Sequence, residues 1–369
     1  MGDPREKGGT GQPNGRKRSV TIHDVARHAG VSSMTASRVV SGSSKVSEEL
    51  RKRVLASIAE LNYVPNVGAR AARSGATRIG VLFSNPRSSN LGAFLMGAFG
   101  ESSRSGVQLI VEPVAGHARE LDAVKKVLSL GVDGVILPPP LCDSFDAFEV
   151  LQRAHVPALC FASAMPRPHS AAVLIDDFEG ARAMTRHLIA LGHRRIAFVR
   201  GNPTHSPAIR REEGFRMAMA EAELDVGPDL IAQGDFTYKS GLEVGQQLLD
   251  RPTEKRPTAI FASNDDMAAA IIAVAHGADI KVPQDLSIAG FDDTPLASVL
   301  WPPLTTVHQP LAEMASKAVE IMTDQIRQAR SGGEPEPVHH VAPFTIVERA
   351  STGPPGKAAT TPAAEVAYQ

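Results

Sequence analysis

Polar side chains that could hold a small ligand follow several apolar, β-rich runs of the sequence. Each of these runs ends in a carboxylate or an amide, and such groups exchange hydrogen bonds with the hydroxyl groups of a ligand. Because the carboxyl ends of parallel strands meet at one edge of a sheet, side chains from separate runs would converge there. The residues at these run ends are Asn85, Asp176, Asn202, Asn264, Asp265, Asp292 and Asp293.

A reaction centre is not predicted by the sequence. No phosphate-binding loop of the Gly-x-x-x-x-Gly-Lys type follows a strand, and no candidate nucleophile is accompanied by a base. Cys142 and Cys160 lack the spacing of a redox pair or a zinc site and are interpreted as small apolar fillers. We therefore expect no enzyme, no metal and no cofactor. The histidines interpreted as surface or capping groups are His187, His193, His339 and His340.

The charge of the chain is unevenly distributed. The whole sequence has a formal net charge of -1, yet residues 16–78 contain twelve basic and only four acidic side chains. Everything after Arg78 is net acidic. A small basic segment ahead of a large acidic body predicts a polyanionic partner for the front end alone.

Residues 19–65 have the pattern of three short helices. Thr21 can cap a first helix, Gly30 ends it, and a second helix of residues 33–41 follows a turn of three to four residues, which is typical of a helix-turn-helix. Ser47 caps a third helix of residues 48–61, whose basic run 51–53 is expected to face outward. The alternative is a small helical interaction domain with a solvated basic face.

The second of these helices would enter the major groove of DNA with its amino end first. Arg38 could bind a guanine with two parallel donors or hold only a phosphate, and the sequence leaves both open. The predicted contacts are Ser33, Met34, Ser37 and Arg38 at base edges, and Ser32 and Thr35 at phosphates.

The segment NVGARAARSG, residues 66–75, is basic, Ala-rich and too short to form a stable helix alone. We expect a coil that becomes helical only on DNA, where two copies of the segment would meet over the minor groove.

From Arg78 onward, apolar β-rich runs alternate with segments long enough for one helix. This alternation predicts an α/β fold with parallel sheets covered by helices on both faces. The nine or ten runs exceed the needs of one doubly wound sheet, so two lobes are expected.

These patterns divide the chain into five parts. No apolar run approaches the ~20 residues of a membrane-spanning helix, and the charged, Gly/Pro-rich start excludes a secretory signal, which predicts a cytoplasmic protein without membrane contact. The parts are a disordered tail (1–18), a helix-turn-helix domain (19–65), a hinge (66–77), a two-lobed core (78–350) and a second disordered tail (351–369).

Several motifs resemble the LacI/GalR family of bacterial transcriptional regulators, in the family's order and from about Val20 to Glu348. The front end carries VTIHDVARHAGVSSMTASRVVSG and VSEELRKRVLASIAELNYVPN, which resemble the family's DNA-binding headpiece. The motifs that resemble its effector-binding core are LGHRRIAFVRG at 191–201, RREEGF at 210–215, FASNDDMA at 261–268, SIAGFDDTPLA at 287–297 and PLTTVHQP at 303–310.

The resemblance implies a repressor of carbohydrate-utilisation genes that binds a palindromic operator and is released by a sugar-like effector. It also implies a homodimer, with pairing into a tetramer left open, and a core similar to periplasmic sugar-binding proteins. The chain would cross between the lobes three times, giving one lobe from 78–175 plus 308–328 and another from 176–305 plus 338–350. Induction and co-repression both remain open, whereas the missing secretory signal and the DNA-binding module oppose a secreted solute-binding protein.

The resemblance also assigns candidate contacts. Arg211 matches an effector-clamping arginine and Asp292 a hydroxyl-binding aspartate, although Arg211 could instead pair with Glu212 or Glu213, and Asp292 could cap a helix near Thr294. Phe236 would be an aromatic wall or a core residue. The remaining candidates are Asn90, Asn264 and Gln309 for the effector, and Thr21, Lys45, Asn66, Ala69, Arg70 and Ala72 for DNA.

Three positions depart from the family's pattern. Ala72 stands where a leucine usually wedges into a minor-groove step, so operator bending is expected to be smaller or differently supported. Asn90 and Leu91 stand at the expected pocket mouth in place of acidic and aromatic residues. Ala162 and Ser163 replace a frequent Asp–Arg pair, which predicts a less ionic grip on the ligand.

Overall fold

The structure is a computed structural model that describes residues 22–40, 46–61, 76–83, 89–114, 119–333 and 335–356. The chain forms two compact units, residues 1–75 and 76–369, which are considered separately. Within the described residues, no helix is both long enough and apolar enough to cross a membrane. The predictions for Thr21, Lys45, Asn66, Ala69, Arg70 and Ala72 lie outside the described residues, as do those for residues 1–18 and 357–369.

The amino-terminal unit contains three helices: α1 (Ile22–Ala29), α2 (Ser33–Val40) and α3 (Glu48–Glu60). Gly30 ends α1 with a φ of +62°, a conformation that glycine adopts without steric cost. Arg53 is exposed as predicted, and its Nη2 atom also donates to the carbonyl of Ala29 at 2.7 Å, which ties α3 to the end of α1. The small core consists of Val25, Ala26, Ala29, Ala36, Val39 and Val54.

The first lobe of the second unit is a parallel sheet of order β11-β5-β4-β3-β1-β2. Helices α5 (Ser89–Ser105) and α13 (Leu311–Arg330) cover one face, and α6 (Glu120–Ser129) and α7 (Phe145–Arg153) cover the other. The strands are β1 (Arg78–Phe83), β2 (Gln108–Pro113), β3 (Gly134–Leu137), β4 (Ala158–Phe161), β5 (Ala171–Leu174) and β11 (His339–Val341).

Helices α5 and α13 approach each other closely at Gly97. A Cβ atom at this position would lie 1.8 Å from the carbonyl oxygen of Ala312, so only glycine fits there. This contact fixes the position of α13, which packs in the first lobe although it follows a strand of the second lobe in the sequence.

The second lobe has a sheet of order β12-β10-β9-β8-β6-β7, in which β12 alone among the described strands runs antiparallel to its neighbour. Its helices are α8 (Asp177–Ala190), α9 (Ser206–Glu221), α10 (Tyr238–Leu249), α11 (Asp265–Gly277) and α12 (Pro295–Val299). Its strands are β6 (Ile196–Arg200), β7 (Ile231–Gln233), β8 (Ala259–Ala262), β9 (Ser287–Asp292), β10 (Thr305–His308) and β12 (Thr345–Val347).

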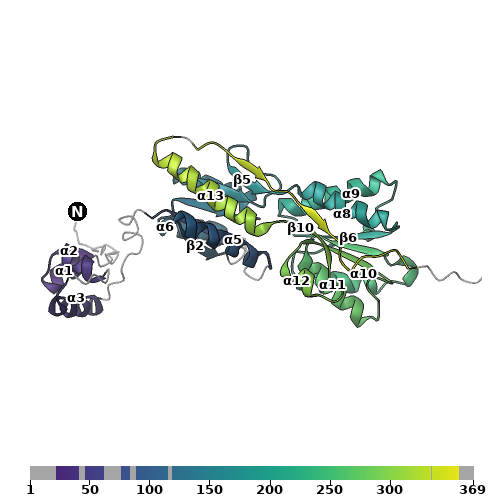
Figure 1. Cartoon of the computed structure of the whole chain (residues 1–369), viewed down its shortest axis with the longest axis horizontal. Coiled ribbons are helices and arrows are strands. Elements are labelled where there is room, and N and C mark those ends of the chain that lie inside the picture. Colours follow the sequence, from purple (N-terminus) through teal and green to yellow (C-terminus); the bar gives the residue numbers. More distant parts are fainter. Residues whose placement is uncertain are drawn as a thin grey trace, which may run out of the picture. The chain divides into compact units, whose positions relative to one another are not determined.

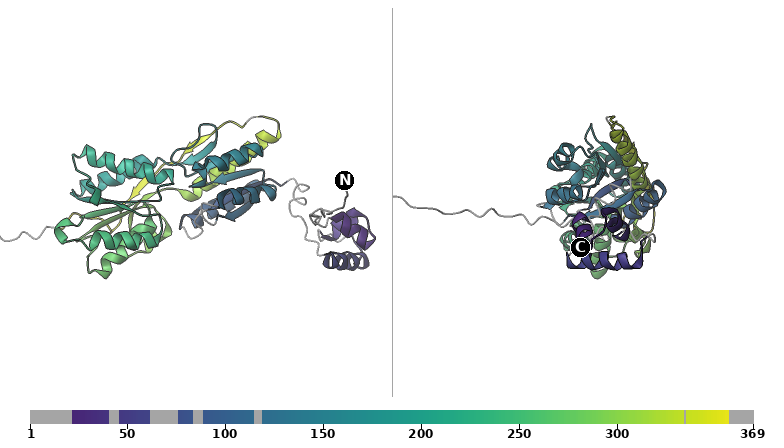
Figure 2. Two further views of the ribbon diagram at one scale, coloured as in Figure 1. Left: turned by 180° about the vertical axis from the view of Figure 1, so that it is seen from behind. Right: turned by 90° about the vertical axis from the view of Figure 1, so that its left-hand side faces the viewer.

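Two doubly wound lobes and a separate helical module confirm the predicted fold class, and the views from both sides show the two lobes of the core (Figure 1, Figure 2). The chain crosses between the sheets after β5, after β10 and between β11 and β12. The lobe boundaries predicted for the last crossing are wrong, because β11 pairs with β5 of the first lobe. Residues 339–341 therefore belong to the first lobe, where their backbone groups complete the edge of the sheet.

The ordered core extends beyond residue 350. The amide of Ile288 donates to the carbonyl of Ser351 at 2.9 Å, and the amide of Thr305 donates to the Ser351 hydroxyl at 2.8 Å. His193 is buried, with its Nε2 atom 2.9 Å from the carbonyl of Gly353, and is not the surface group predicted from the sequence. These bonds satisfy backbone groups at the amino ends of β9 and β10, which explains why residues 351–353 pack against the lobe.

Candidate functional site

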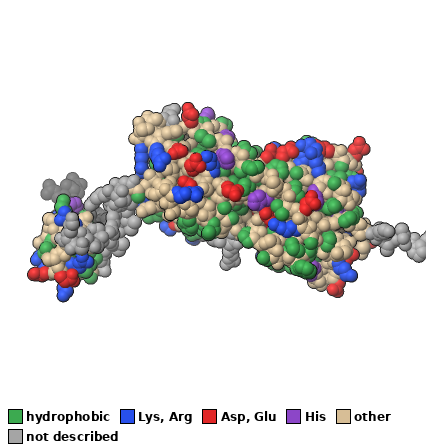
Figure 3. Space-filling model, viewed as in Figure 1, with side chains coloured by type: hydrophobic (Ala, Val, Ile, Leu, Met, Phe, Trp, Pro, Cys, Tyr) green, Lys and Arg blue, Asp and Glu red, His purple; other side chains and the backbone are tan. Residues whose placement is uncertain are grey.

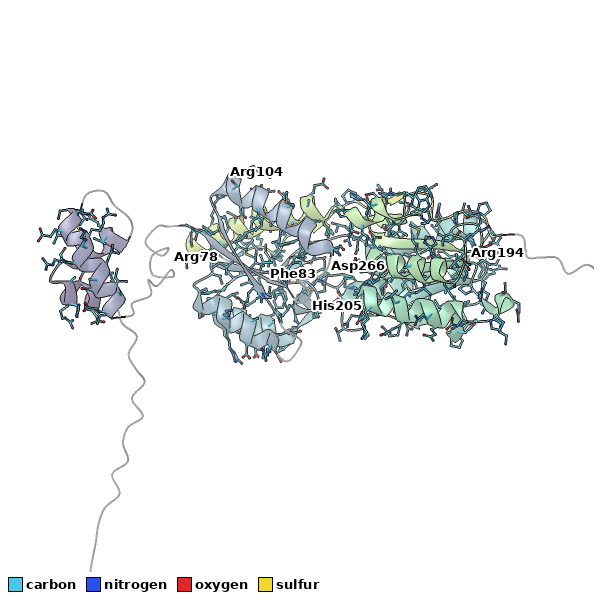
Figure 4. All side chains as sticks on the ribbon, turned by 90° about the horizontal axis from the view of Figure 1, so that it is seen from below. Arg78, Phe83, Arg104, Arg194, His205 and Asp266 are labelled. Carbon is cyan, nitrogen blue, oxygen red and sulfur yellow. The ribbon has the colours of Figure 1, made fainter. Side chains whose placement is uncertain are left out.

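A cavity of about 130 Å³ lies between the two lobes at the carboxyl ends of their strands. Phe83 of the first lobe and His205 of the second, both of which line the cavity, are labelled in Figure 4 where the lobes meet. All six predicted effector contacts line this one cavity: Asn90, Arg211, Phe236, Asn264, Asp292 and Gln309. The other lining residues are Phe83, Phe94, Pro138, Pro139, Phe161, Ala162, His205, Pro207 and Leu311.

Asp292 is the hydrogen-bonding centre of the cavity. Its Oδ1 accepts from Gln309 Nε2 at 2.5 Å, and its Oδ2 accepts from Asn90 Nδ2 at 3.0 Å across the lobe boundary. Its φ of +116° is a strained conformation for an aspartate, which costs about 1–3 kcal/mol and is typical of binding sites. The alternative role as a helix cap is wrong, since Thr294 is the N-cap of α12.

Arg211 is held in place by groups other than its sequence neighbours. Its Nε donates to Asp177 Oδ1 at 2.8 Å and its Nη1 donates to the carbonyl of Ser263 at 2.6 Å. Nη1 also lies 3.5 Å from Asp292 Oδ1, and the guanidinium stacks 3.6 Å from the ring centroid of Phe291.

The neighbouring carboxylates have other partners. Glu212 pairs with Arg200 and Arg216, and Glu213 pairs with Arg210. The alternative pairing of Arg211 with either glutamate is therefore wrong. Sequence reasoning missed Asp177. Its position directly after the run-end residue Asp176 was the signal that could have identified it.

The buried charges around the cavity are not balanced. The buried guanidinium of Arg211 lies against two buried carboxylates, those of Asp177 and Asp292, and a third buried carboxylate, that of Asp265, interacts with Asp292. Burial, followed by repulsion from Asp292, raises the pKa of Asp265 to about 8. Burial also raises the pKa of Asp292 to about 6, against the attraction of Arg211, and raises the pKa of Asp177. At neutral pH the cluster therefore retains a proton on Asp265.

An aromatic wall faces this polar cluster. The ring centroids of Phe236 and His205 are 5.5 Å apart with an interplanar angle of 30°. Phe236 has a φ of +67°, and a Cβ atom at Gly201 would lie 2.0 Å from its ring. Asn264 fixes this segment by donating to the carbonyl of Phe236 at 3.0 Å, while its Oδ1 caps α11 at Met267.

The lobes also touch each other directly beside the cavity. On one side, the amide of Ser206 donates to Asp143 Oδ2 at 3.0 Å, and the amide of Ala164 donates to the Ser206 hydroxyl at 3.0 Å. On the other side, Ser89 Oγ donates to Asp266 Oδ1 at 2.7 Å. Sequence reasoning gave no sign of these contacts, because they join residues 42 to 177 positions apart.

One remaining run-end residue, Asn85, lies outside the described residues. The others serve local structure. Asp176 caps α8, Asn202 accepts from the amide of Thr204, and Asp293 binds His308 and Arg349. Cys142 and Cys160 are buried free thiols, and no His, Cys, Asp or Glu cluster within the described part of the chain could hold a metal ion.

The predicted DNA contacts that the structure describes lie along α2. Met34 and Arg38 are exposed, whereas Ser33, Thr35 and Ser37 are half-buried. The Ser32 hydroxyl accepts from the amide of Thr35 at 3.1 Å, and the Ser33 hydroxyl lies 2.8 Å from His23 Nδ1. Ser32 thus stabilises the start of α2 in addition to any contact it makes with DNA.

A helix-turn-helix module joined to a two-lobed ligand-binding core defines a class of protein, the ligand-responsive DNA-binding regulators. Comparisons with known proteins agree with this class at both ends of the chain. The family model "Bacterial regulatory proteins, lacI family" matches residues 21–66, and "Periplasmic binding protein-like domain" matches residues 185–352.

The transcriptional regulator DegA of Bacillus subtilis is 35% identical, over 90% of this chain and 98% of that protein. The ribose operon repressor of Escherichia coli is 34% identical, over 84% of this chain and 93% of that repressor. The lac repressor dimer bound to operator and the anti-inducer ONPF is a structural neighbour with a TM-score of 0.67 and 30% identity, covering 91% of this chain and 100% of that one. The regulator CelR in complex with cellobiose is a structural neighbour with a TM-score of 0.68 and 30% identity, covering 90% of this chain and 99% of that one.

The chain belongs to the LacI family of bacterial regulatory proteins. Since its relatives are transcriptional regulators, the prediction that the chain is not an enzyme is confirmed.

Proposed function

We propose that this protein represses carbohydrate-utilisation genes in the cytoplasm and leaves its operator when a small sugar-like effector binds between the lobes. The observation that carries the proposal is the convergence of Arg211, Asp292 and four other polar or aromatic side chains on one interlobe cavity. The chain that contains this cavity also carries a helix-turn-helix module of the LacI family.

The chemistry of the cavity favours an uncharged polyol. Asp292 accepts hydrogen bonds, while Arg211, Asn90 and Gln309 donate them, and this mixture suits hydroxyl groups. Phe236 offers a flat apolar surface to a sugar ring. A phosphorylated sugar is disfavoured because Asp177 already neutralises Arg211, the only Lys or Arg among the lining residues.

The effector acts by selecting a lobe arrangement. In the described arrangement Asn90 of the first lobe bonds directly to Asp292 of the second, so an effector that binds Asp292 competes with a contact between the lobes. The start of the first lobe is fixed to its own sheet, since the amide of Arg78 donates to Asp133 at 2.8 Å. A ligand changes DNA affinity only by its differential affinity for the two arrangements.

The repressor acts as a homodimer, and assembly into a tetramer remains open. Large apolar side chains on the second unit are available to a partner copy, with Trp301 82% and Met96 74% exposed. Two headpieces on one dimer would match the two halves of a palindromic operator. The face of the core in Figure 3 intersperses acidic and basic side chains, as expected of a surface without affinity for DNA.

The test is a thermal-shift screen of the full chain against neutral monosaccharides and their phosphates, followed by operator titration with the sugar that stabilises the protein. A ligand that binds only the folded state raises the melting temperature. Asp292→Ala is expected to retain operator affinity and to lose the sugar's effect. Loss of operator binding with the sugar response retained would refute the assignment.

A further inference from the structure

A second cavity lies in the first lobe and shares no lining residue with the interlobe cavity. It measures about 400 Å³, against about 130 Å³ for the interlobe cavity. One wall is the face of α7 that carries Phe145, Phe148 and Gln152, which lie three and four residues apart on one side of the helix. The other wall is the segment of residues 167–170 between β4 and β5.

Arg167 on this wall lies against two aromatic rings, and no described carboxylate pairs with it. Its Cζ atom lies 4.8 Å from the ring centroid of Phe148 and 5.5 Å from that of Phe145. Its Nε atom is buried and has no hydrogen-bond acceptor among the described residues. Buried donors of a charged group are nearly always paired, because leaving them unpaired is unfavourable. The geometry therefore leaves room for an acceptor supplied from outside the chain.

The one carboxylate on the cavity wall does not serve Arg167. Glu149 accepts from Arg153 Nη2 at 2.6 Å, so its charge is neutralised by an arginine that does not line the cavity. A monoanion would complete the pairing of Arg167, the only Lys or Arg among the lining residues, whereas a dianion would leave one of its two charges unbalanced.

The aromatic side chains indicate what the anion is attached to. Phe145 is 66% exposed, which leaves one apolar ring open at the mouth of the cavity. Flat apolar groups stack on such rings. We propose that this cavity, between α7 and residues 167–170, is a second ligand site that binds a small aromatic carboxylate, with the carboxylate on Arg167 and the ring against Phe145.

The site adjoins the contacts that join the lobes. Its helical wall follows Asp143 and its other wall follows Ala164, and both residues bond to Ser206 of the second lobe. A ligand there would lie against the elements that hold the two lobes together.

The experiment is calorimetric titration of the full-length protein with 4-hydroxybenzoate. Benzyl alcohol tests the need for the charge, inorganic phosphate tests the need for the ring, and phenyl phosphate tests the preference for a monoanion. Benzyl alcohol and inorganic phosphate are each expected to bind at least about tenfold more weakly, because one lacks the charge-assisted hydrogen bond and the other lacks the ring contact. Phenyl phosphate keeps both, and it is expected to bind more weakly because its dianion leaves one charge unbalanced.

Variants locate the binding. Arg167→Gln and Phe145→Ala are each expected to weaken 4-hydroxybenzoate binding by about tenfold or more. Arg104→Gln, which removes an exposed arginine that pairs with Glu101 away from this cavity, should bind it as the wild type does, and so should Asp292→Ala. The proposal is overturned by absence of binding, by equal binding of benzyl alcohol or phosphate, or by loss in Asp292→Ala with retention in Arg167→Gln. Because Phe145 is largely exposed, Phe145→Ala remains informative even where Arg167→Gln fails to fold.

Discussion

The Oδ1 atom of Asp177 lies 2.8 Å from the Nε atom of Arg211, and both side chains are buried. This ion pair joins the first turn of α8 to α9 across 34 residues of sequence. It fixes the long Arg211 side chain so that the rest of its guanidinium faces Ser263, Asp292 and the cavity. The proposed effector contact of Arg211 thus depends on Asp177, a residue that does not line the cavity.

Asp177→Ala is expected to destabilise the protein by about 3–5 kcal/mol, because it leaves a buried guanidinium without its main partner. The free energy of unfolding from urea denaturation measures this loss. Glu213→Gln serves as the control, since Glu213 pairs with Arg210 at the surface and such pairs contribute about 0–1 kcal/mol. Equal effects of the two substitutions would contradict the role of Asp177.

Stability is expected to fall as the pH rises from 6.5 to about 8. Asp265 has a folded-state pKa of about 8 against an ordinary value of 3.8, so in this window the folded protein retains a proton that the unfolded chain has lost. The free energy of unfolding decreases with pH wherever the folded state binds more protons. Below pH 6.5 His193 opposes this trend. Burial lowers its pKa from 6.5, so the folded protein binds fewer protons at this residue than the unfolded chain, and the free energy of unfolding rises with pH.

Asp265→Asn tests this account, because it removes the titrating carboxyl while retaining polar atoms for Thr294 and Thr306, which donate to Asp265. Urea denaturation at several pH values should show a flatter profile for this variant. Glu243→Gln, at an exposed pair with Lys239, should leave the slope as in the wild type. A wild-type stability that rises between pH 6.5 and 8 would argue against the buried proton.

Asp143→Ala is expected to loosen the described lobe arrangement. The substitution removes the acceptor for the amide of Ser206 and for the hydroxyl of Ser163. Hydrogen bonds to a charged group contribute about 1.5–3 kcal/mol, so the equilibrium between lobe arrangements should shift by about tenfold or more. Small-angle scattering and effector titration measure the shift. Asp146→Asn, a substitution at an exposed residue three positions away, should change neither the scattering profile nor the effector affinity. If Asp143→Ala also left both unchanged, the contact would not bias the lobe arrangement.

Ala72→Leu is expected to tighten operator binding. Position 72 lies outside the described residues, and the prediction rests on the family's use of a leucine wedge in the minor groove. Anisotropy titration with labelled operator measures the affinity. Ala71→Leu places the same side chain one residue out of register and should give no gain. An affinity of Ala72→Leu equal to or below that of the wild type would refute the prediction.

Much of the fold could be predicted because its signals are local. Alternating β-rich runs and helical segments identified two doubly wound lobes, and strand-end positions together with family motifs identified Arg211 and Asp292 at the cavity. The strand β11 escaped prediction because its sequence, HHV, has no apolar pattern and its pairing with β5 is tertiary.

The partners of the site residues could not be predicted for a similar reason. Asp177 and Arg211 are far apart in sequence, and the nearer Glu212 and Glu213 were more obvious partners. The segment around Ser351 is rich in Ser, Gly and Pro, as is typical of a tail, yet it packs because it satisfies backbone groups of β9 and β10.

The most direct test of the account is an operator titration of the purified full-length protein at two salt concentrations, with and without the sugar found in the thermal-shift screen. We predict a strong preference for one palindromic duplex, weaker affinity at higher salt because basic side chains displace counterions, and a further loss of affinity when the sugar is present. A protein that showed no salt-sensitive preference for any palindromic duplex, with or without candidate sugars, would contradict the claim that the basic module binds DNA under control of the interlobe cavity.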